Sequence, residues 1–135
     1  MKYFTMAELV QSAVARTLHI DNRPGKTEQL NLVALVTNIL DPVREKLGEP
    51  IYVSSAYRSP RLNRAVGGVA DSQHMKGEAA DVYTKSVVGN KRLYDLMLNM
   101  PFDQLIWERG DDKAPAWVHV SYCRDRKNRG EVLRL

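Results

Sequence analysis

Three side chains with metal-binding chemistry lie in two short and chemically unusual segments of the chain. His74 and Asp81 are seven positions apart, and His119 follows within Trp-Val-His-Val-Ser at 117–121. Two imidazoles and one carboxylate can hold a zinc ion while a fourth position stays open for water. Asp81 ends a run of small residues, where a carboxylate is unfavourable unless a cation meets it. The sequence therefore predicts a zinc site with His74, Asp81 and His119 as ligands.

Two expected strands can position these ligands. Alternate side chains of a strand point to opposite faces, so Asp81 and His119 each occupy one face of strands expected at 79–83 and 116–123. If the two strands are neighbours, they direct a carboxylate and an imidazole to one point. His74 then enters from the loop that precedes the first of these strands.

The rest of the chain has helical patterns first and mostly strand patterns later. Thr5 and Glu8 form a capping box, and Pro42 should kink or restart the second helix. This order predicts an α+β fold with a small, mostly antiparallel sheet flanked by helices. The expected helices span 5–18, 27–47, 60–65 and 87–100, and the expected strands span 51–55, 79–83, 102–108 and 116–123.

Length and composition fit one globular domain. The chain has 135 residues, of which 44% are hydrophobic and 27% charged. We expect a single domain over 1–135, with N-terminal helices at about 5–47, a catalytic core at about 50–123 and a basic tail at 124–135. We also expect a monomer.

The net charge is +4 and the sequence pI is about 9.3. The basic tail either serves as a solvated segment or favours contact with anionic polymers such as cell wall. It lacks the interleaved aromatic residues of a stacking platform, so no nucleic-acid partner is expected. Its basic residues are Arg124, Arg126, Lys127, Arg129 and Arg134.

Several features limit where the chain could act. Cys123 is the only cysteine, so an internal disulfide is impossible. No stretch approaches the roughly 20 apolar residues of a membrane span, and no membrane insertion is expected. Glu8 falls where a signal peptide would need its apolar core. We therefore expect a protein that is cytoplasmic as synthesised.

Ordered motifs extend the pattern beyond the metal ligands. They include Ser-Ser-Ala-Tyr-Arg-Ser-Pro at 54–60, Gly-Gly at 67–68 and the Phe-Asp-x4-Glu run at 102–108. With the ligand segments, they resemble the D-Ala-D-Ala carboxypeptidase and endolysin family of zinc peptidases (the M15 type), which shares its fold with the Hedgehog signalling domain. The resemblance covers about 50–122, and 3–9 resembles the start of a bacterial or prophage branch.

This resemblance implies a zinc-dependent peptidase that hydrolyses the stem peptides of peptidoglycan. Such an enzyme would be a D-Ala-D-Ala carboxypeptidase or a murein endopeptidase, as in a phage or prophage lysin. It would reach the cell wall after release or holin-type export. The alternative is a non-catalytic zinc-containing domain of the Hedgehog-like fold that binds a ligand or partner.

The family resemblance implies that Glu108 is the base that takes a proton from water. Many members carry the corresponding acidic or histidine residue three to five positions before the last ligand, where this chain has Ala-Pro-Ala at 114–116. Glu108 therefore takes the role, with Asp111 or Asp112 as the alternative if their loop folds inward.

Arg58 matches an arginine that in relatives binds substrate and stabilises the oxyanion. Alternatively, it is a structural residue that braces the loop at Asn63. Ser72 and Gln73 either line the substrate cleft or shape the turn that presents His74. For His19 and Cys123, which lie outside these motifs, we expect ordinary structural roles.

Overall fold

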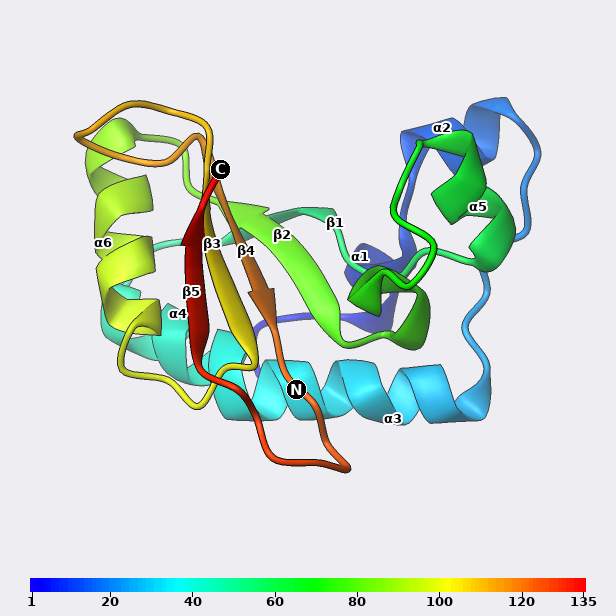
Figure 1. Ribbon diagram of the computed structural model, residues 1–135, viewed down its shortest axis with the longest axis horizontal. Coiled ribbons are helices and arrows are strands. Elements are labelled where there is room, and N and C mark those ends of the chain that lie inside the picture. The colour runs from blue at the N-terminus through cyan, green and yellow to red at the C-terminus, as the bar shows by residue number, and fades with distance from the viewer.

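The fold is organised around a five-stranded sheet with the strand order β1-β2-β4-β3-β5 (Figure 1). The structure, a computed structural model, describes all 135 residues. The first four strands pair antiparallel, and β5 pairs parallel to β3. The sheet is therefore mixed but mostly antiparallel, which confirms the predicted α+β class. The strands are β1 (Tyr52–Ser55), β2 (Ala79–Tyr83), β3 (Gln104–Glu108), β4 (Trp117–Ser121) and β5 (Glu131–Arg134).

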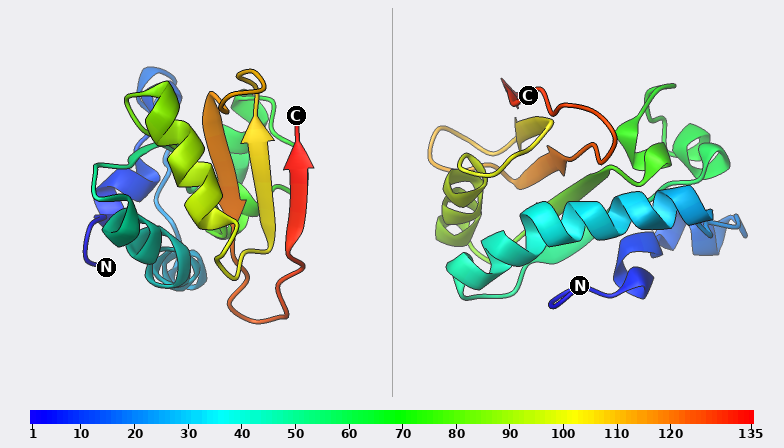
Figure 2. Two further views of the ribbon diagram at one scale, coloured as in Figure 1. Left: turned by 90° about the vertical axis from the view of Figure 1, so that its left-hand side faces the viewer. Right: turned by 90° about the horizontal axis from the view of Figure 1, so that it is seen from below.

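Helices cover one face of this sheet. A long helical rod runs along it, and α6 packs beside the rod at one end (Figure 2). None of the helices combines the length and apolar character needed to cross a bilayer. The elements are α1 (Met6–Val10), α2 (Ala13–Thr17), α3 (Lys26–Leu35), the π-helical η1 (Val36–Leu40), α4 (Asp41–Leu47), α5 (Pro60–Ala65), the 3-10 helix η2 (Gln73–Lys76) and α6 (Val87–Met97).

The core lies between the helical rod and the covered face of the sheet. Alternate strand residues, including Val82, Leu105, Val118 and Val120, are fully buried there. The intervening residues belong to the opposite, uncovered face. Asp81 and His119 are on that uncovered face, as alternation predicts. The hydrophobic effect thus fixes which face can carry polar chemistry.

The first predicted helix is wrong in one respect, because the chain forms two short helices instead. Gln11 is extended (φ −66°, ψ 144°) and ends α1. Ser12 then begins α2, and its side chain accepts a hydrogen bond from the Ala15 N–H at 3.1 Å. A serine that can cap a new helix competes with continuation of the old one, and the apolar spacing does not reveal this.

The second predicted helix is one continuous rod from Lys26 to Leu47. The irregularity expected at Pro42 takes the form of the π-helical turn η1 immediately before it. Asp41 N–H donates to the Val36 carbonyl five residues back. Because proline has no N–H to donate, a local change in hydrogen-bond pattern accommodates it without a break in the rod.

β5 was not predicted, since it falls within the segment described as a basic tail. Leu135 N–H donates to the Trp107 carbonyl at 2.9 Å, which continues the ladder with β3. The Arg134 guanidinium lies 4.2 Å from the centroid of the Trp107 ring. Val132 and Leu133 are both partly exposed, so the strand lacks the apolar alternation that would reveal it in sequence.

A buried carboxylate attaches this C-terminal segment to the sheet. Asp103 is fully buried and forms ion pairs of 2.8 Å with both Arg126 and Arg129. It also accepts the Arg129 backbone N–H at 2.9 Å. Burial alone would raise the pKa of Asp103, but hydrogen bonds from Arg129 and Arg126 outweigh burial and hold the pKa well below that of an ordinary aspartate.

We expect Asp103→Asn to lower the free energy of unfolding near neutral pH by about 1.5–3 kcal/mol, because charged hydrogen bonds to two guanidiniums are lost. A lowered folded-state pKa contributes stability above the unfolded-state pKa and loses it as pH falls. The difference from wild type should therefore shrink below about pH 4. Denaturant melts at several pH values measure it.

Asp112→Asn is the matched control, because Asp112 also pairs with an arginine, Arg134, but is fully exposed. It should leave the melting temperature nearly unchanged. Equal effects of the two substitutions would show that the buried Asp103 network does not anchor the C-terminal segment.

Candidate metal centre

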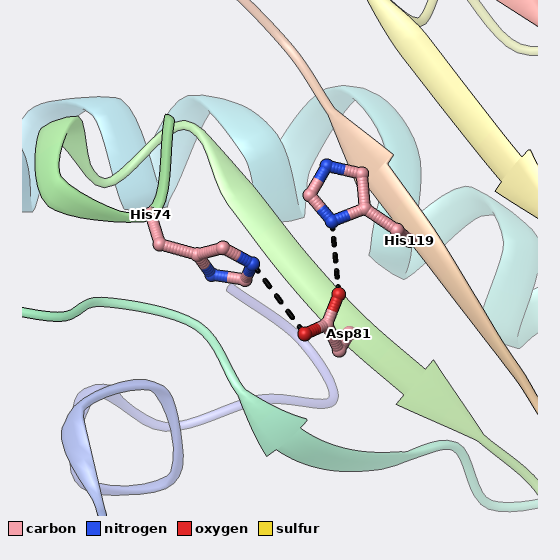
Figure 3. A group of neighbouring side chains, drawn as sticks. All are labelled: His74, Asp81 and His119. Carbon is pink, nitrogen blue, oxygen red and sulfur yellow. Dashed lines mark hydrogen bonds and ion pairs between the residues drawn. The ribbon is translucent and has the colours of Figure 1, made fainter. Parts of the chain in front are cut away.

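His74, Asp81 and His119 converge on one point of the uncovered sheet face (Figure 3). Each offers a ligand atom, and these atoms all lie within 4.8 Å of one another. Asp81 Oδ1 is 2.9 Å from His119 Nδ1, and Asp81 Oδ2 is 3.4 Å from His74 Nε2. The three residues come from β2, β4 and η2, so the tertiary fold brings together ligands from separate segments.

Strand register aligns two of the ligands. Asp81 of β2 is the direct cross-strand partner of His119 of β4. Directly opposed residues in an antiparallel pair have side chains on the same face and close together. Because the other faces of both strands are packed in the core, a one-residue shift of either strand would turn its polar group toward the core. Packing on the covered face thus fixes the alignment of these two ligands.

His74 is oriented by the short helix η2. The Ser72 hydroxyl accepts the His74 N–H at 3.2 Å, and Gly77 ends the turn with φ 73°. A Cβ at Gly77 would overlap the Glu28 carbonyl of α3, so the close approach of this turn to α3 requires glycine. The backbone around His74 is therefore fixed at both ends.

A hydrogen bond on the far side of the His74 ring decides which nitrogen is available to a metal. His74 Nδ1 is 2.6 Å from the Ala56 carbonyl oxygen. A carbonyl can only accept, so Nδ1 carries a proton, and Nε2 is the ring nitrogen that faces Asp81 and would bind a metal once it carries no proton. This arrangement of a ligand histidine on a carbonyl is typical of metal sites.

Asp81 is held in its charged form. Burial alone would raise the pKa of Asp81, but hydrogen bonds with His119 and His74 outweigh burial and hold the pKa well below the ordinary range. The Arg58 guanidinium adds a further positive charge, with Nη2 3.8 Å from Asp81 Oδ2. Both oxygens of the Asp81 carboxylate therefore share its negative charge and are available as metal ligands at neutral pH.

This donor set fits a zinc ion. Ligand atoms at 2.0–2.2 Å from a tetrahedral metal lie about 3.3–3.6 Å apart. The Asp81 Oδ2 to His74 Nε2 distance of 3.4 Å lies in that range, and His119 Nδ1, which is 2.9 Å from the other carboxylate oxygen, Oδ1, is near enough to join the same ion after a small shift. Two imidazole nitrogens and one carboxylate oxygen would leave a fourth position open.

The cluster lies in a cavity of about 540 Å³ on the uncovered face. This size suits a small ligand or a few residues of a peptide. The sheet forms the floor of the cavity. Gln104, Ile106 and Glu108 of β3 lie on the same face of the sheet as Asp81 and His119. Ser72, Gln73 and Arg58 also line it, so the cavity contains every residue predicted as catalytic, ligating or substrate-binding.

Glu108 lies at the end of β3 and lines this cavity. Its cross-strand partner is Trp117, two residues before His119 on the same strand face. Burial, and then the negative charge of Asp81, raise the pKa of Glu108, while His119 and Arg109 act in the opposite direction. A carboxylate with a raised pKa is better suited to accept and later return a proton.

The alternative bases do not reach the cavity. The Asp111 side chain accepts the backbone N–H groups of Lys113 at 2.8 Å and Ala114 at 3.2 Å. The exposed Asp112 pairs with Arg134 at 3.1 Å. Neither lines the cavity, so the loop does not fold inward; besides Asp81, the carboxylates that line it are Glu108 and Asp71.

Arg58 lines the cavity and also braces the loop at Asn63, so its position is compatible with both roles that the sequence suggested. Its Nε donates to the Ser55 hydroxyl at 3.2 Å, and its Nη1 donates to Asn63 Oδ1 at 3.0 Å. A Cβ at Gly68 would overlap Asn63 Oδ1 and lie 2.8 Å from Arg58 Nη1. Glycine is therefore needed for this loop to hold the guanidinium, whose Nη2 is directed toward Asp81.

The remaining residues divide between the cavity and the core. Gln73 lines the cavity, but its amide donates to Glu78 Oε1 at 3.3 Å and Asp103 Oδ2 at 3.1 Å, which also supports a structural role. Cys123 is buried, and burial, then the charges of Glu78 and Asp103, raise the pKa of its thiol to about 11. His19 is exposed and outside the site.

Several cavity residues were not predicted from the sequence. Val69 and Asp71 belong to the loop before η2, where no periodic pattern points to the cavity. Strand alternation could have found Gln104 and Ile106, which share the face of Glu108. Arg129 lies in the supposed basic tail and carries no local signal. The cavity-lining residues that were missed are Val69, Asp71, Gln104, Ile106, Trp117 and Arg129.

We expect the purified protein to bind about one divalent metal ion per chain, held by two imidazoles and a carboxylate. His119→Ala should lose it, because two ligands seldom retain a catalytic metal. Removal of the ion with a chelator should lower the melting temperature of wild type, since the ligands join three segments. Elemental analysis and thermal melts measure these effects. His19→Ala is the control and should keep full metal content.

One of two comparisons with known proteins identifies a family for the chain. No curated protein sequence matches the chain at a significant level. The sequence model of the family described as Peptidase M15 matches residues 2–121, a range that includes all three candidate ligands, Arg58 and Glu108. On this match and the site that accompanies it, the chain belongs to the peptidase M15 family.

Proposed function

We propose that this chain is a zinc-dependent peptidase that hydrolyses the stem peptides of peptidoglycan, as a D-Ala-D-Ala carboxypeptidase or a murein endopeptidase. The observation that carries the proposal is the shared cavity. A ligand set of His74, Asp81 and His119 lies there with an unpaired carboxylate, Glu108, and an anchored guanidinium, Arg58. A phage or prophage lysin would combine this chemistry with the basic composition of the chain.

Glu108 acts first as the general base and then as the general acid in this mechanism. A zinc ion bound by His74, Asp81 and His119 would polarise the scissile carbonyl and lower the pKa of water in the site toward about 7. Glu108 accepts the proton that the attacking water loses. It then donates that proton to the nitrogen of the leaving amine, which balances the hydrolysis. Its raised pKa brings it closer to the range in which both transfers are efficient.

Arg58 binds the oxygen on which negative charge develops. Its bonds to Ser55 and Asn63 fix the guanidinium before the substrate arrives, so little reorganisation is needed during the reaction. Its Nη2 is also the part of the group closest to the metal ligands. The same group could hold a substrate carboxylate, because guanidinium geometry matches both oxyanions.

The direct test is digestion of purified muropeptides by zinc-loaded protein, with products identified by mass spectrometry. Loss of terminal D-alanine identifies a carboxypeptidase, and cleavage within the stem or cross-bridge identifies an endopeptidase. A chelator-treated sample is the control. Intact muropeptides after exposure to fully zinc-loaded protein would favour the non-catalytic zinc-binding alternative, which gives no reason for Glu108 and Arg58 to line the cavity.

We expect Glu108→Gln to retain zinc but lower turnover by about 10²–10⁴-fold, because an amide cannot accept the proton. Asp111→Asn and Asp112→Asn are matched controls on the nearby loop and should stay close to wild type. A muropeptide assay compares them. An active Glu108→Gln beside an inactive loop variant would move the base to that loop.

Glu108→Gln should also raise the melting temperature of the metal-free protein near neutral pH. A group with a raised folded-state pKa costs stability where it is ionised, and this cost disappears once pH falls below the unfolded-state pKa. The gain should therefore vanish below about pH 4. Thermal melts in chelator at the two pH values measure it, and a gain that persists at low pH would contradict the electrostatic cause.

We expect Arg58→Lys to keep zinc and fold but to lower turnover by about 10²–10³-fold, the typical loss of one oxyanion donor. Lysine keeps the charge but not the planar, two-pronged contact. A thermal melt and a muropeptide assay on the same sample separate the two roles of Arg58. A lowered melting temperature with unchanged turnover would assign it to bracing the Asn63 loop alone.

A further inference from the structure

Arg129 lines the cavity, but neither the metal ligands nor the proposed mechanism uses it. It belongs to the loop that joins β4 to β5 and lies beyond the residues 2–121 that match the family. This loop extends past the ends of β3 and β4 before the chain returns as β5 (Figure 1). The C-terminal segment thus adds a guanidinium to a cavity that is otherwise built by the earlier part of the chain.

The guanidinium of Arg129 is held in place by Asp103, but some of its N–H donors have no partner. Its Nε and Nη2 donate to the Asp103 carboxylate, with the Nη2 bond at 2.8 Å, while Nη1 has no protein partner. The side chain is 49% exposed, so its remaining N–H groups can be reached from the cavity. A fixed guanidinium with free donors can bind an anion with little loss of side-chain entropy.

The carboxylates near Arg129 form their hydrogen bonds with other donors and leave its Nη1 donors free. Asp103 carries one negative charge but pairs with two guanidiniums, those of Arg126 and Arg129. The other carboxylate near Arg129 is Glu131, which accepts the Gln104 side-chain amide at 2.6 Å. Asp103 and Glu131 together offset the two positive charges, so an incoming carboxylate would be bound through the free N–H donors of Arg129 and not through a surplus of charge.

Strand register gives the position of Arg129 relative to the metal ligands. Gln104 of β3 pairs with Glu131 of β5, two residues after Arg129, whereas Ile106 pairs with His119. Gln104 and Ile106 are separated by about 7 Å along the strand. Glu108 lies in the opposite direction from Ile106. Arg129 is thus at one end of the cavity, Glu108 at the other, and the ligand set between them.

The spacing along β3 corresponds to a short stretch of peptide. An extended chain advances about 3.3–3.6 Å per residue. A peptide whose scissile carbonyl reaches the ligand set can therefore place a group one or two residues away against Arg129. Peptidoglycan stem peptides carry carboxylates at such positions, either at the chain end or on an acidic residue.

We propose that Arg129 binds a substrate carboxylate located one or two residues from the scissile bond, and so makes the enzyme selective for acidic peptides. This inference rests on the proposed function and adds a specificity-determining residue to it. The source of the carboxylate, a terminal α-carboxylate or that of a D-glutamyl residue, is distinguished by experiment.

The test compares three synthetic peptides with zinc-loaded, full-length protein. The first is L-Ala-γ-D-Glu-L-Lys-D-Ala-D-Ala, the second is its C-terminal amide, and the third has D-isoglutamine in place of the D-glutamyl residue. Turnover gives kcat and KM for each. Trp117 lines the cavity, so fluorescence titration in a Glu108→Gln background measures binding without cleavage.

Arg126→Gln is the matched control for Arg129→Gln. Both arginines pair with Asp103 at 2.8 Å and are about half exposed, but only Arg129 lines the cavity. We expect Arg129→Gln to raise KM for the unmodified peptide about 10-fold or more, with kcat nearly unchanged. We expect Arg126→Gln to keep the wild-type KM. Whichever modified peptide binds wild type weakly, and is unaffected by Arg129→Gln, identifies the carboxylate.

Two outcomes would overturn the inference alone. The first is a wild type that cleaves all three peptides with the same KM. The second is an equal rise in KM for Arg126→Gln and Arg129→Gln, which would show that both act through Asp103. A wild type that neither binds nor cleaves any of the peptides would overturn the proposed function, and this inference with it.

Discussion

The structure depends on a charged carboxylate, that of Asp81, held on a sheet whose opposite face is the hydrophobic core. Burial disfavours the ionised form, so Asp81 needs the two imidazoles and the nearby guanidinium around it. Those partners come from η2, β4 and the loop after β1. The requirement to neutralise one buried charge therefore joins three separate segments and gives them the geometry of a metal site.

The packed, covered face of the sheet supports the candidate site on the uncovered face. The rod of α3, η1 and α4 packs against the covered face, where residues such as Val82, Val118 and Val120 are fully buried. Their packing fixes the strand register, and the register fixes how Asp81 faces His119. Apolar packing on the covered face of these strands thus positions the polar side chains on the uncovered face. The polar groups of the cavity therefore remain available to bind a ligand.

Asp103 plays a related part at the far end of the cavity. Like Asp81 it is a buried carboxylate kept ionised by cationic partners, but those partners are Arg126 and Arg129 of the C-terminal segment. Gln73 contacts Asp103 and precedes His74, so this second network is joined to the turn that presents a ligand. Hydrogen bonds therefore connect the C-terminal segment to Gln73, the residue next to the candidate ligand His74.

The sequence by itself determined the candidate ligand set, the α+β class, the two-faced strands and the Thr5 capping box, because short-range spacing and side-chain chemistry encode each of them. Only the tertiary structure decided the break at Ser12, the strand β5, the position of Asp111 and Asp112 outside the cavity, and the presence of Arg129 within it. Two short helices separated by a capping serine and one unbroken helix have similar apolar spacing, so tertiary packing decides between them. β5 and Arg129 depend on pairing with β3 and on Asp103, partners more than 20 residues away, and no local pattern records such contacts.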